Sequence, residues 1–160
     1  MSLAIVPGSF DPMTLGHLDI VANVASRYDE VVVAVMVNHA KKYCFDMETR
    51  VEIAKKTVAS FSNVRVIADT GMLIDLFDRL NADAVCKGWR NAADYEYELH
   101  MADWNQAHNP RFRTEMIRAK NAHEELSSTE VRRMLQDGET LDGYVHADAI
   151  PLILQAFYKF

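Results

Sequence analysis

The sequence predicts an α/β domain with a mainly parallel sheet and helices on both of its faces. Short apolar and β-branched runs alternate with segments whose apolar residues recur at helical spacing. The run at 31–37 is apolar on both alternations, which is typical of a parallel strand covered on both sides. The 160 residues fit one domain, and no repeat or linker divides them, so we expect a single domain over residues 1–160.

The first half of the chain is expected to form three strands and three helices. A short apolar run at 3–6 is stopped by Pro7-Gly8, and further strands are expected at 31–37 and 64–68. Helical spacing of apolar residues predicts helices over 18–28, 47–61 and 73–80. Asp46 precedes the second of these helices and is a suitable N-cap residue.

The second half continues the alternation with strands at 84–87 and 113–118 and a helix over 94–107. Ser127 and Glu130 fit a capping box that opens the next helix, and Gly138 lies just beyond its expected end. A last helix is expected over 148–158. Because crossovers in parallel sheets are right-handed, ligands should bind outside the carboxyl ends of the strands, near a switch in strand order.

Charge and composition exclude several classes of protein. With 17 basic and 23 acidic residues the formal charge is −6, so we expect no nucleic-acid partner. The longest apolar run is far shorter than the roughly 20 residues of a membrane span, so we expect no membrane partner. The two cysteines form no disulfide framework, and the N-terminus lacks the basic region of a signal peptide. A cytoplasmic location is therefore expected.

The segment from Pro7 to Asp19 joins the first strand to the first helix. Gly8 and Gly16 remove side chains where backbone N–H groups could approach an anion, and Ser9 adds a hydroxyl donor. His17 stands at the start of the helix, where the helix dipole favours phosphate. A glycine turn before a helix is also common without any ligand, and the spacing matches neither a Walker loop nor a dinucleotide fingerprint.

This run resembles the signature of the nucleotidyltransferases that carry a [T/H]-x-G-H motif, present as Thr14-Leu15-Gly16-His17. The wider pattern Pro-Gly-Ser-Phe-Asp-Pro-x-Thr-x-Gly-His-x-Asp is similar to that of bacterial phosphopantetheine adenylyltransferases. The resemblance implies a Rossmann-like single nucleotidyltransferase domain. It also implies an enzyme that transfers the adenylyl group of ATP to 4′-phosphopantetheine, giving dephospho-CoA and pyrophosphate in the penultimate step of coenzyme A biosynthesis.

Two later segments are similar to the same family. Lys87-Gly88-Trp89-Arg90 ends the fourth expected strand and is followed by the acidic and aromatic stretch 94–98. Two cations around a glycine at a strand end suit a phosphate site. The segment 127–133 resembles the family's Ile-Ser-Ser-Thr-x-Val-Arg, whose physical meaning is a capped helix N-terminus that can hold an anion.

The resemblance implies a role for each matching residue. The catalytic residues would be His17, Ser9 and Lys41. Contacts to phosphopantetheine would come from Ser9, Lys41, Leu73 and Lys87, and contacts to ATP from Ser9, Phe10, His17, Gly88, Arg90, Glu98, Ser127, Ser128 and Thr129. No dedicated carboxylate cage is evident, so Mg²⁺ would be bound to the nucleotide and not to the protein. The family is typically a homohexamer, which implies a homo-oligomer here.

Departures at Trp89 and at residues 121–125 leave two alternatives open. The first is a related nucleotidyltransferase with another acceptor, nicotinamide mononucleotide or glycerol phosphate. The second is a non-catalytic nucleotide-binding protein, against which the joint presence of Ser9, His17, Lys41 and Arg90 argues. A panel of acceptors and nucleotides separates these alternatives.

Overall fold

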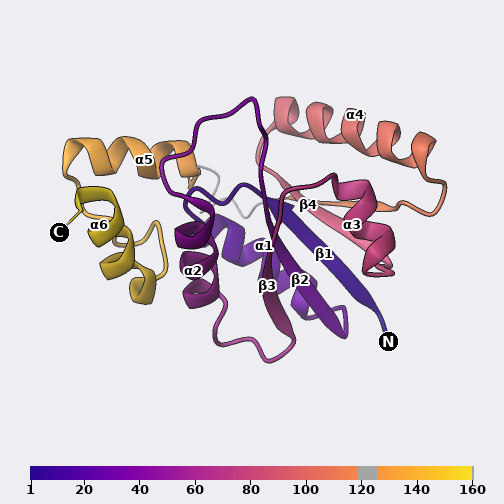
Figure 1. The fold of residues 1–160 in the computed structure, drawn as a ribbon, viewed down its shortest axis with the longest axis horizontal. Helices are drawn as coiled ribbons and strands as arrows, with labels where there is room; N and C mark the ends of the chain where they lie inside the picture. Colours follow the sequence, from indigo (N-terminus) through magenta and orange to yellow (C-terminus); the bar gives the residue numbers. More distant parts are fainter. Residues whose placement is uncertain (119–125, 160) are drawn as a thin grey trace.

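The computed structural model describes residues 1–118 and 126–159, and residues 121–125 therefore lie outside the described part of the chain. Within it, five parallel strands form one sheet in the order β3-β2-β1-β4-β5 (Figure 1). The strands are β1 (Leu3–Gly8), β2 (Glu30–Met36), β3 (Val64–Asp69), β4 (Ala84–Trp89) and β5 (Thr114–Arg118). The parallel sheet expected from the sequence is confirmed.

The helices also follow the expected order. They are α1 (Leu15–Ala25), α2 (Met47–Thr57), α3 (Leu73–Arg79), α4 (Ala92–His108), α5 (Ser128–Asp137) and α6 (Ile150–Tyr158), and the short 3₁₀ turn η2 (Ala147–Ala149) precedes α6. Two helices end earlier than expected. Ser26 caps α1 and Val58 caps α2, so Tyr28 and Phe61 follow their helices, yet both still pack against the core.

Buried side chains gather on both faces of the sheet, because successive strand residues point to opposite sides. The larger cluster joins Ala4 and Val6 of β1 to α1, α2, α5 and α6. The smaller cluster joins Ile5, the residue between them, to Leu76 and Phe77 of α3. The sheet is therefore covered on both faces, and the sequence prediction of a doubly covered sheet is confirmed.

The order of the strands reverses at the centre of the sheet. The chain runs outward from β1 through β2 to β3, and then returns to place β4 on the other side of β1. Helix α6 lies beside α2, α5 lies at the same end of the molecule, and α4 lies at the other end (Figure 1). The carboxyl ends of β1 and β4 therefore border the switch point, where α/β sheets bind their ligands. No helix in the described ranges is long and apolar enough to cross a membrane.

Candidate active site

A cavity of about 510 Å³ lies at the carboxyl ends of β1 and β4. Eleven of the twelve residues that the sequence assigns to the site line it: Ser9, Phe10, His17, Lys41, Lys87, Gly88, Arg90, Glu98, Ser127, Ser128 and Thr129. Leu73 instead lines a second, mostly apolar cavity of about 950 Å³, beside Met72, Ile74, Met101 and Trp104. Ser9 and Lys87 border both cavities, so the two are neighbours with a shared wall.

Phe10 shapes the loop that leaves β1. Its backbone adopts a left-handed conformation with φ 48°, which is uncommon for a residue other than glycine, and its ring is buried. A Cβ atom on Gly8 would lie 2.9 Å from the ring of Phe10. The structure thus gives Gly8 a packing role, and Gly8 also lines both cavities, so the expected approach of its backbone to an anion stays a prediction.

His17 is held by a reciprocal capping arrangement at the start of α1. The Thr14 hydroxyl accepts a hydrogen bond from the backbone N–H of His17, and His17 Nδ1 accepts one from the backbone N–H of Thr14 at 3.0 Å. The Thr14 hydroxyl itself donates to the carbonyl of Leu126 at 3.1 Å. Because Nδ1 is an acceptor, the proton of the neutral ring resides on Nε2.

The environment of His17 keeps its ring neutral. Burial, and then the positive charge of Arg90, lower the pKa of His17 from 6.5 to about 4. The edge of the Phe10 ring approaches the imidazole, with 5.0 Å between the two ring centroids. His17 therefore lines the cavity as a neutral hydrogen-bond donor at physiological pH, a state suited to stabilising negative charge on a phosphoryl group.

Two of the cations at the cavity are already paired with carboxylates. Lys87 Nζ lies 3.0 Å from a carboxylate oxygen of Glu98 on α4, and Arg90 Nε lies 3.1 Å from that of Asp94. A third cation, Lys41, stands on an exposed turn after β2, where its backbone N–H donates to the carbonyl of Asn38. An incoming polyphosphate therefore meets this exposed lysine, two cations whose carboxylate partners it must share, and Arg132, which also lines the cavity.

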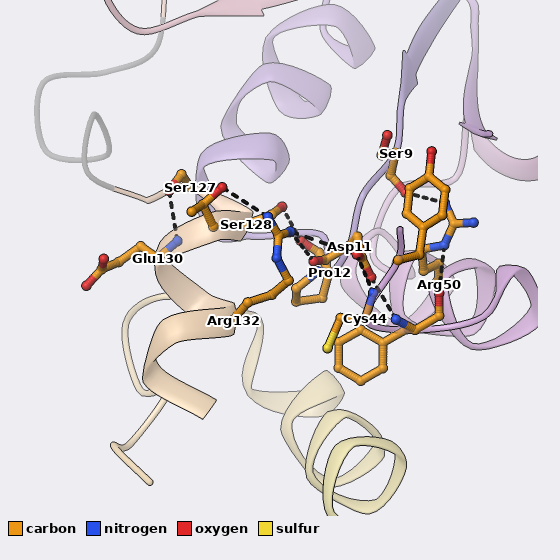
Figure 2. A network of polar contacts seen from close by, with 12 residues as sticks. Ser9, Asp11, Pro12, Cys44, Arg50, Ser127, Ser128, Glu130 and Arg132 are labelled. Atoms are coloured by element: carbon orange, nitrogen blue, oxygen red, sulfur yellow. Dashed lines mark hydrogen bonds and ion pairs between the residues drawn. The ribbon is translucent and has the colours of Figure 1, made fainter. Parts of the chain in front are cut away.

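The N-terminus of α5 forms the opposite wall of the cavity. Ser127 is the N-cap, and its hydroxyl accepts from the backbone N–H of Glu130 at 3.0 Å. The expected reciprocal bond of a capping box is replaced, because the Glu130 carboxylate accepts from Arg133. The Ser128 hydroxyl donates to the carbonyl of Pro12 at 2.7 Å (Figure 2). An anion at this wall would therefore be bound mainly by the backbone N–H groups of the first turn of α5.

Glycine at position 88 is required by the packing of α1 against β4. A Cβ atom at this position would lie 2.9 Å from Cγ1 of Ile20 on α1. Glycine here lets α1 lie close to β4, and this contact brings His17 next to the end of that strand.

Three charged residues of the site were missed by sequence reasoning. Arg132 donates to the carbonyl of Asp11 at 2.8 Å from the α5 side, and the Asp11 carboxylate accepts from the backbone N–H groups of Cys44 and Phe45 on the other side (Figure 2). Arg50 approaches the same loop from α2. Asp11 and Arg132 stand within the two family motifs, and Arg50 is a charged residue among the apolar positions of a helix, so each of them carried a signal in the sequence.

A protein-held metal cluster finds no support in the donor set of the cavity. In the described ranges, no three side chains of histidine, cysteine, aspartate or glutamate come together in a way that could hold a metal ion. The cavity walls carry cations and N–H groups, which fit phosphate oxygens.

Comparison with known families agrees with this architecture. A model of the cytidylyltransferase-like family matches residues 5–134. Together with the parallel sheet and the cation-lined cavity at its switch point, this match defines the class of the protein as a cytidylyltransferase-like nucleotidyltransferase. A crystal structure of a candidate nicotinate-nucleotide adenylyltransferase from Vibrio parahaemolyticus has the same fold. It superposes with a TM-score of 0.75 at 17% identity and covers 99% of this chain and 96% of its own.

Curated relatives identify the family within this class of nucleotidyltransferases. The phosphopantetheine adenylyltransferase of Streptomyces coelicolor is 40% identical over 156 residues, covering 98% of this chain and 95% of its own. That of Clostridium kluyveri is 38% identical over 159 residues, covering 99% of this chain and 97% of its own. The chain belongs to the phosphopantetheine adenylyltransferase family.

Proposed function

We propose that this protein transfers the adenylyl group of ATP to 4′-phosphopantetheine, giving dephospho-CoA and pyrophosphate. The observation that carries the proposal is a phosphate-type cavity that shares a wall with an apolar one in a member of this family. A polyphosphate and an acceptor with a long, weakly polar arm can bind there side by side. The apolar cavity fits the pantetheine arm better than the ribose and charged ring of nicotinamide mononucleotide.

The reaction needs no covalent intermediate. An oxygen of the phosphopantetheine phosphate attacks the α-phosphorus of ATP, and a new P–O bond forms. The bond between the α-phosphorus and the oxygen bridging to the β-phosphate breaks, and pyrophosphate leaves with that electron pair. Catalysis then consists mainly of positioning two anions in line and stabilising the charge that develops between them.

Three residues would act on the transferred group. His17 Nε2–H would donate to an oxygen of the α-phosphate, since the capping contact with Thr14 occupies Nδ1. Ser9 stands on the loop after β1, on the wall shared by the two cavities, where both reacting phosphates would meet. Lys41, on its exposed turn, would bridge the attacking phosphate and the α-phosphate.

The remaining residues would bind the two substrates. ATP would be held by Phe10, Gly88, Arg90 and Glu98, and its β- and γ-phosphates would lie against the N-terminus of α5 at Ser127, Ser128 and Thr129. Lys87 would bind the phosphate of phosphopantetheine, and Leu73 would contact its arm. Mg²⁺ bound to ATP would neutralise part of the phosphate charge.

The same proposal includes the cellular location and the oligomeric state of the protein. The unpaired cysteines Cys44 and Cys86 support a reducing, cytoplasmic location. We take the homohexamer from the family resemblance, and the apolar side chains that α4 exposes, among them Tyr97, Leu99 and Trp104, support association between copies of the chain. Neither nucleic acid nor a membrane is a partner in this proposal.

Mass spectrometry of the reaction products tests the function. The protein is incubated with Mg²⁺, ATP and 4′-phosphopantetheine, and in parallel with nicotinamide mononucleotide or glycerol phosphate as acceptor. Dephospho-CoA and pyrophosphate should form in equal amounts only with the first acceptor. Product from another acceptor would reassign the substrate, and ATP binding without any product would identify a non-catalytic nucleotide-binding protein.

A further inference from the structure

Arg50 is a buried guanidinium behind the candidate active site. It projects from α2 with only 2% of its surface exposed. Its Nη1 donates to the carbonyl of Ser9 at 2.8 Å and to that of Met36 at 3.2 Å, and its Nε donates to the carbonyl of Phe45 at 3.1 Å. Figure 2 shows Arg50 beside Ser9, next to the contacts around Asp11.

The partners of Arg50 are unusual for a buried cation. Within residues 1–118 and 126–159, the guanidinium donates to three backbone carbonyls and contacts the ring of Tyr43, and its charge also acts on the carboxylate of Asp46. Burying an arginine is costly unless its donors are satisfied, and a carboxylate is the usual partner. Here the guanidinium lies directly behind the loop that carries Ser9, a residue that lines both cavities.

The three carbonyls belong to three separate segments around the cavity. Ser9 lies on the loop after β1, Met36 ends β2, and Phe45 lies just before α2. A planar guanidinium fixes the relative positions of all three, because its donors point in set directions. One side chain thus connects the loop that carries Ser9 to both ends of the segment that carries Lys41.

Tyr43 extends this support to the Lys41 turn. The guanidinium carbon of Arg50 lies 4.0 Å from the centroid of the Tyr43 ring. The Tyr43 hydroxyl accepts from the backbone N–H of Asn38 at 2.6 Å, and the Asn38 carbonyl accepts from the backbone N–H of Lys41 at 2.9 Å. A continuous path of contacts therefore runs from Arg50 through Tyr43 and Asn38 to Lys41.

We propose that Arg50 is a positioning residue for adenylyl transfer. It fixes the position of Ser9 relative to the Lys41 turn, so that both can contact the reacting phosphates. This inference rests on the proposed function and adds a residue that touches neither substrate. Arg50 acts on the reacting centre only through the backbone that it braces. Its removal should lower kcat more than it raises the KM for ATP, since the described contacts of Arg90 and of the N-terminus of α5 do not involve Arg50.

The first test compares Arg50→Lys with Ile53→Ala. Lysine keeps the charge but lacks the planar fork, so it cannot bridge the three carbonyls in the same way. Ile53 is fully buried on the same helix and packs in the core, so its truncation destabilises the fold without removing any hydrogen bond to the loops. At a temperature where both variants are folded, Arg50→Lys should lose ~10-fold to 10²-fold in kcat, with the KM for ATP changed less than about threefold.

Ile53→Ala should keep kcat within about twofold of the unmodified protein under the same conditions, because its cavity lies in the core. Equal losses of kcat in both variants, or a kcat for Arg50→Lys within about twofold of the unmodified protein, would overturn the proposal. If the lysine variant does not fold, Arg50→Gln is compared with Ile53→Ala in the same way.

Hydrogen exchange provides a readout that does not depend on turnover. In Arg50→Lys, amides of residues 37–45 should exchange faster than in the unmodified protein, while those of 31–35 in β2 should not change. Unchanged exchange over 37–45 contradicts the role of Arg50. Absence of product in the unmodified protein would instead overturn the proposed function, and the exchange data would still decide whether Arg50 orders these loops.

Discussion

His17 shows how one backbone contact selects the chemistry of a side chain. The N–H of Thr14 points at Nδ1, and this fixes the tautomer with the proton on Nε2. A protonated ring would place an N–H against that same N–H, so the contact and the enclosed position both favour the neutral form. The result is a donor that carries no charge of its own and that gains strength as the phosphoryl oxygens become more negative.

Replacing His17 should therefore affect turnover more than folding. We expect His17→Ala to lower kcat by ~10²-fold or more, as is typical when a single donor to a developing anion is lost. Steady-state kinetics together with circular dichroism checks this expectation, and His39→Ala, on the exposed turn after β2, is the matched control. A loss smaller than about threefold in folded His17→Ala would remove this residue from the mechanism.

The pKa of His17 also predicts how stability depends on pH. The unfolded chain takes up a proton at His17 near pH 6.5, whereas the folded protein does so only near pH 4. Between these values the unfolded state binds more protons, so the folded state loses stability as the pH falls. The loss reaches about 3 kcal/mol at pH 4 and is absent above pH 6.5.

Urea unfolding of the unmodified protein and of His17→Gln at one protein concentration measures this loss. The variant lacks the titrating ring, so its free energy of unfolding should fall less between pH 7 and pH 4. All other ionisable groups are common to both proteins and cancel in the difference. Parallel curves for the two proteins would mean that His17 titrates normally in the folded state.

At the residue scale, the sequence predicted the groups that face a ligand better than those that support them. Ser9, His17 and Arg90 stand in local motifs that a linear pattern can reveal. Asp11 stands in the same motif as Ser9, but its carboxylate accepts from a residue 33 positions away, and Arg50 acts on one 41 positions away. Such contacts depend on which loops the sheet brings together, and no spacing along the chain encodes them.

At the scale of elements, α5 forms a wall of the site through the way it begins. Ser127 caps its first turn, and Ser128 and Arg132 tie that turn to the loop after β1 (Figure 2). The N-terminus of the helix is thereby aimed at the cavity. Its dipole and its free N–H groups can act on an anion only while this attachment holds.

Removing the cap should weaken the helix by a measurable amount. We expect Ser127→Ala to lower the free energy of unfolding by about 1 kcal/mol, because the N–H of Glu130 loses its acceptor. Ser62→Ala, on an exposed turn before β3, serves as the control and should change stability by less than about 0.5 kcal/mol. Identical stabilities of the two variants would show that Ser127 does not cap α5.

The sequence placed every strand and helix that the structure describes, and it erred mainly at their ends. Periodicity reports which side chains face the core, and Tyr28 and Phe61 do so although their helices have already ended. The expected capping box at α5 was only half formed, since Arg133 competes for Glu130. A full capping arrangement occurs instead at Thr14 and His17, where a histidine takes the place of the usual glutamate.

At the scale of the whole molecule, strand order decides which residues meet. The sequence predicted a parallel sheet, but the position of β1 between β2 and β4 follows from pairings between distant segments. That central position brings the loop after β1 next to the end of β4. Ser9 and Arg90 therefore line one cavity although 81 positions separate them in the chain.

The exposed face of α4 is where we expect copies of the chain to contact one another. Leu99 is 38% exposed and lines neither cavity, so it is a suitable probe of an interface between copies. We expect sedimentation to give the mass of six chains for the unmodified protein, and Leu99→Glu to shift the protein toward smaller species, because a buried unpaired carboxylate is costly. Lys55→Glu on α2 is the control. A monomeric unmodified protein would contradict the hexamer.

Lys87 stands on the wall between the two cavities and is paired with Glu98. A phosphate that draws Lys87 toward one cavity frees the Glu98 carboxylate and alters the electrostatic potential felt in the other. The two substrates should therefore influence each other's affinity, and thermodynamics requires that each changes the other's dissociation constant by the same factor. A single ion pair thus couples the binding of the two substrates. In Lys87→Met, the factor by which one substrate changes the dissociation constant of the other should be closer to one.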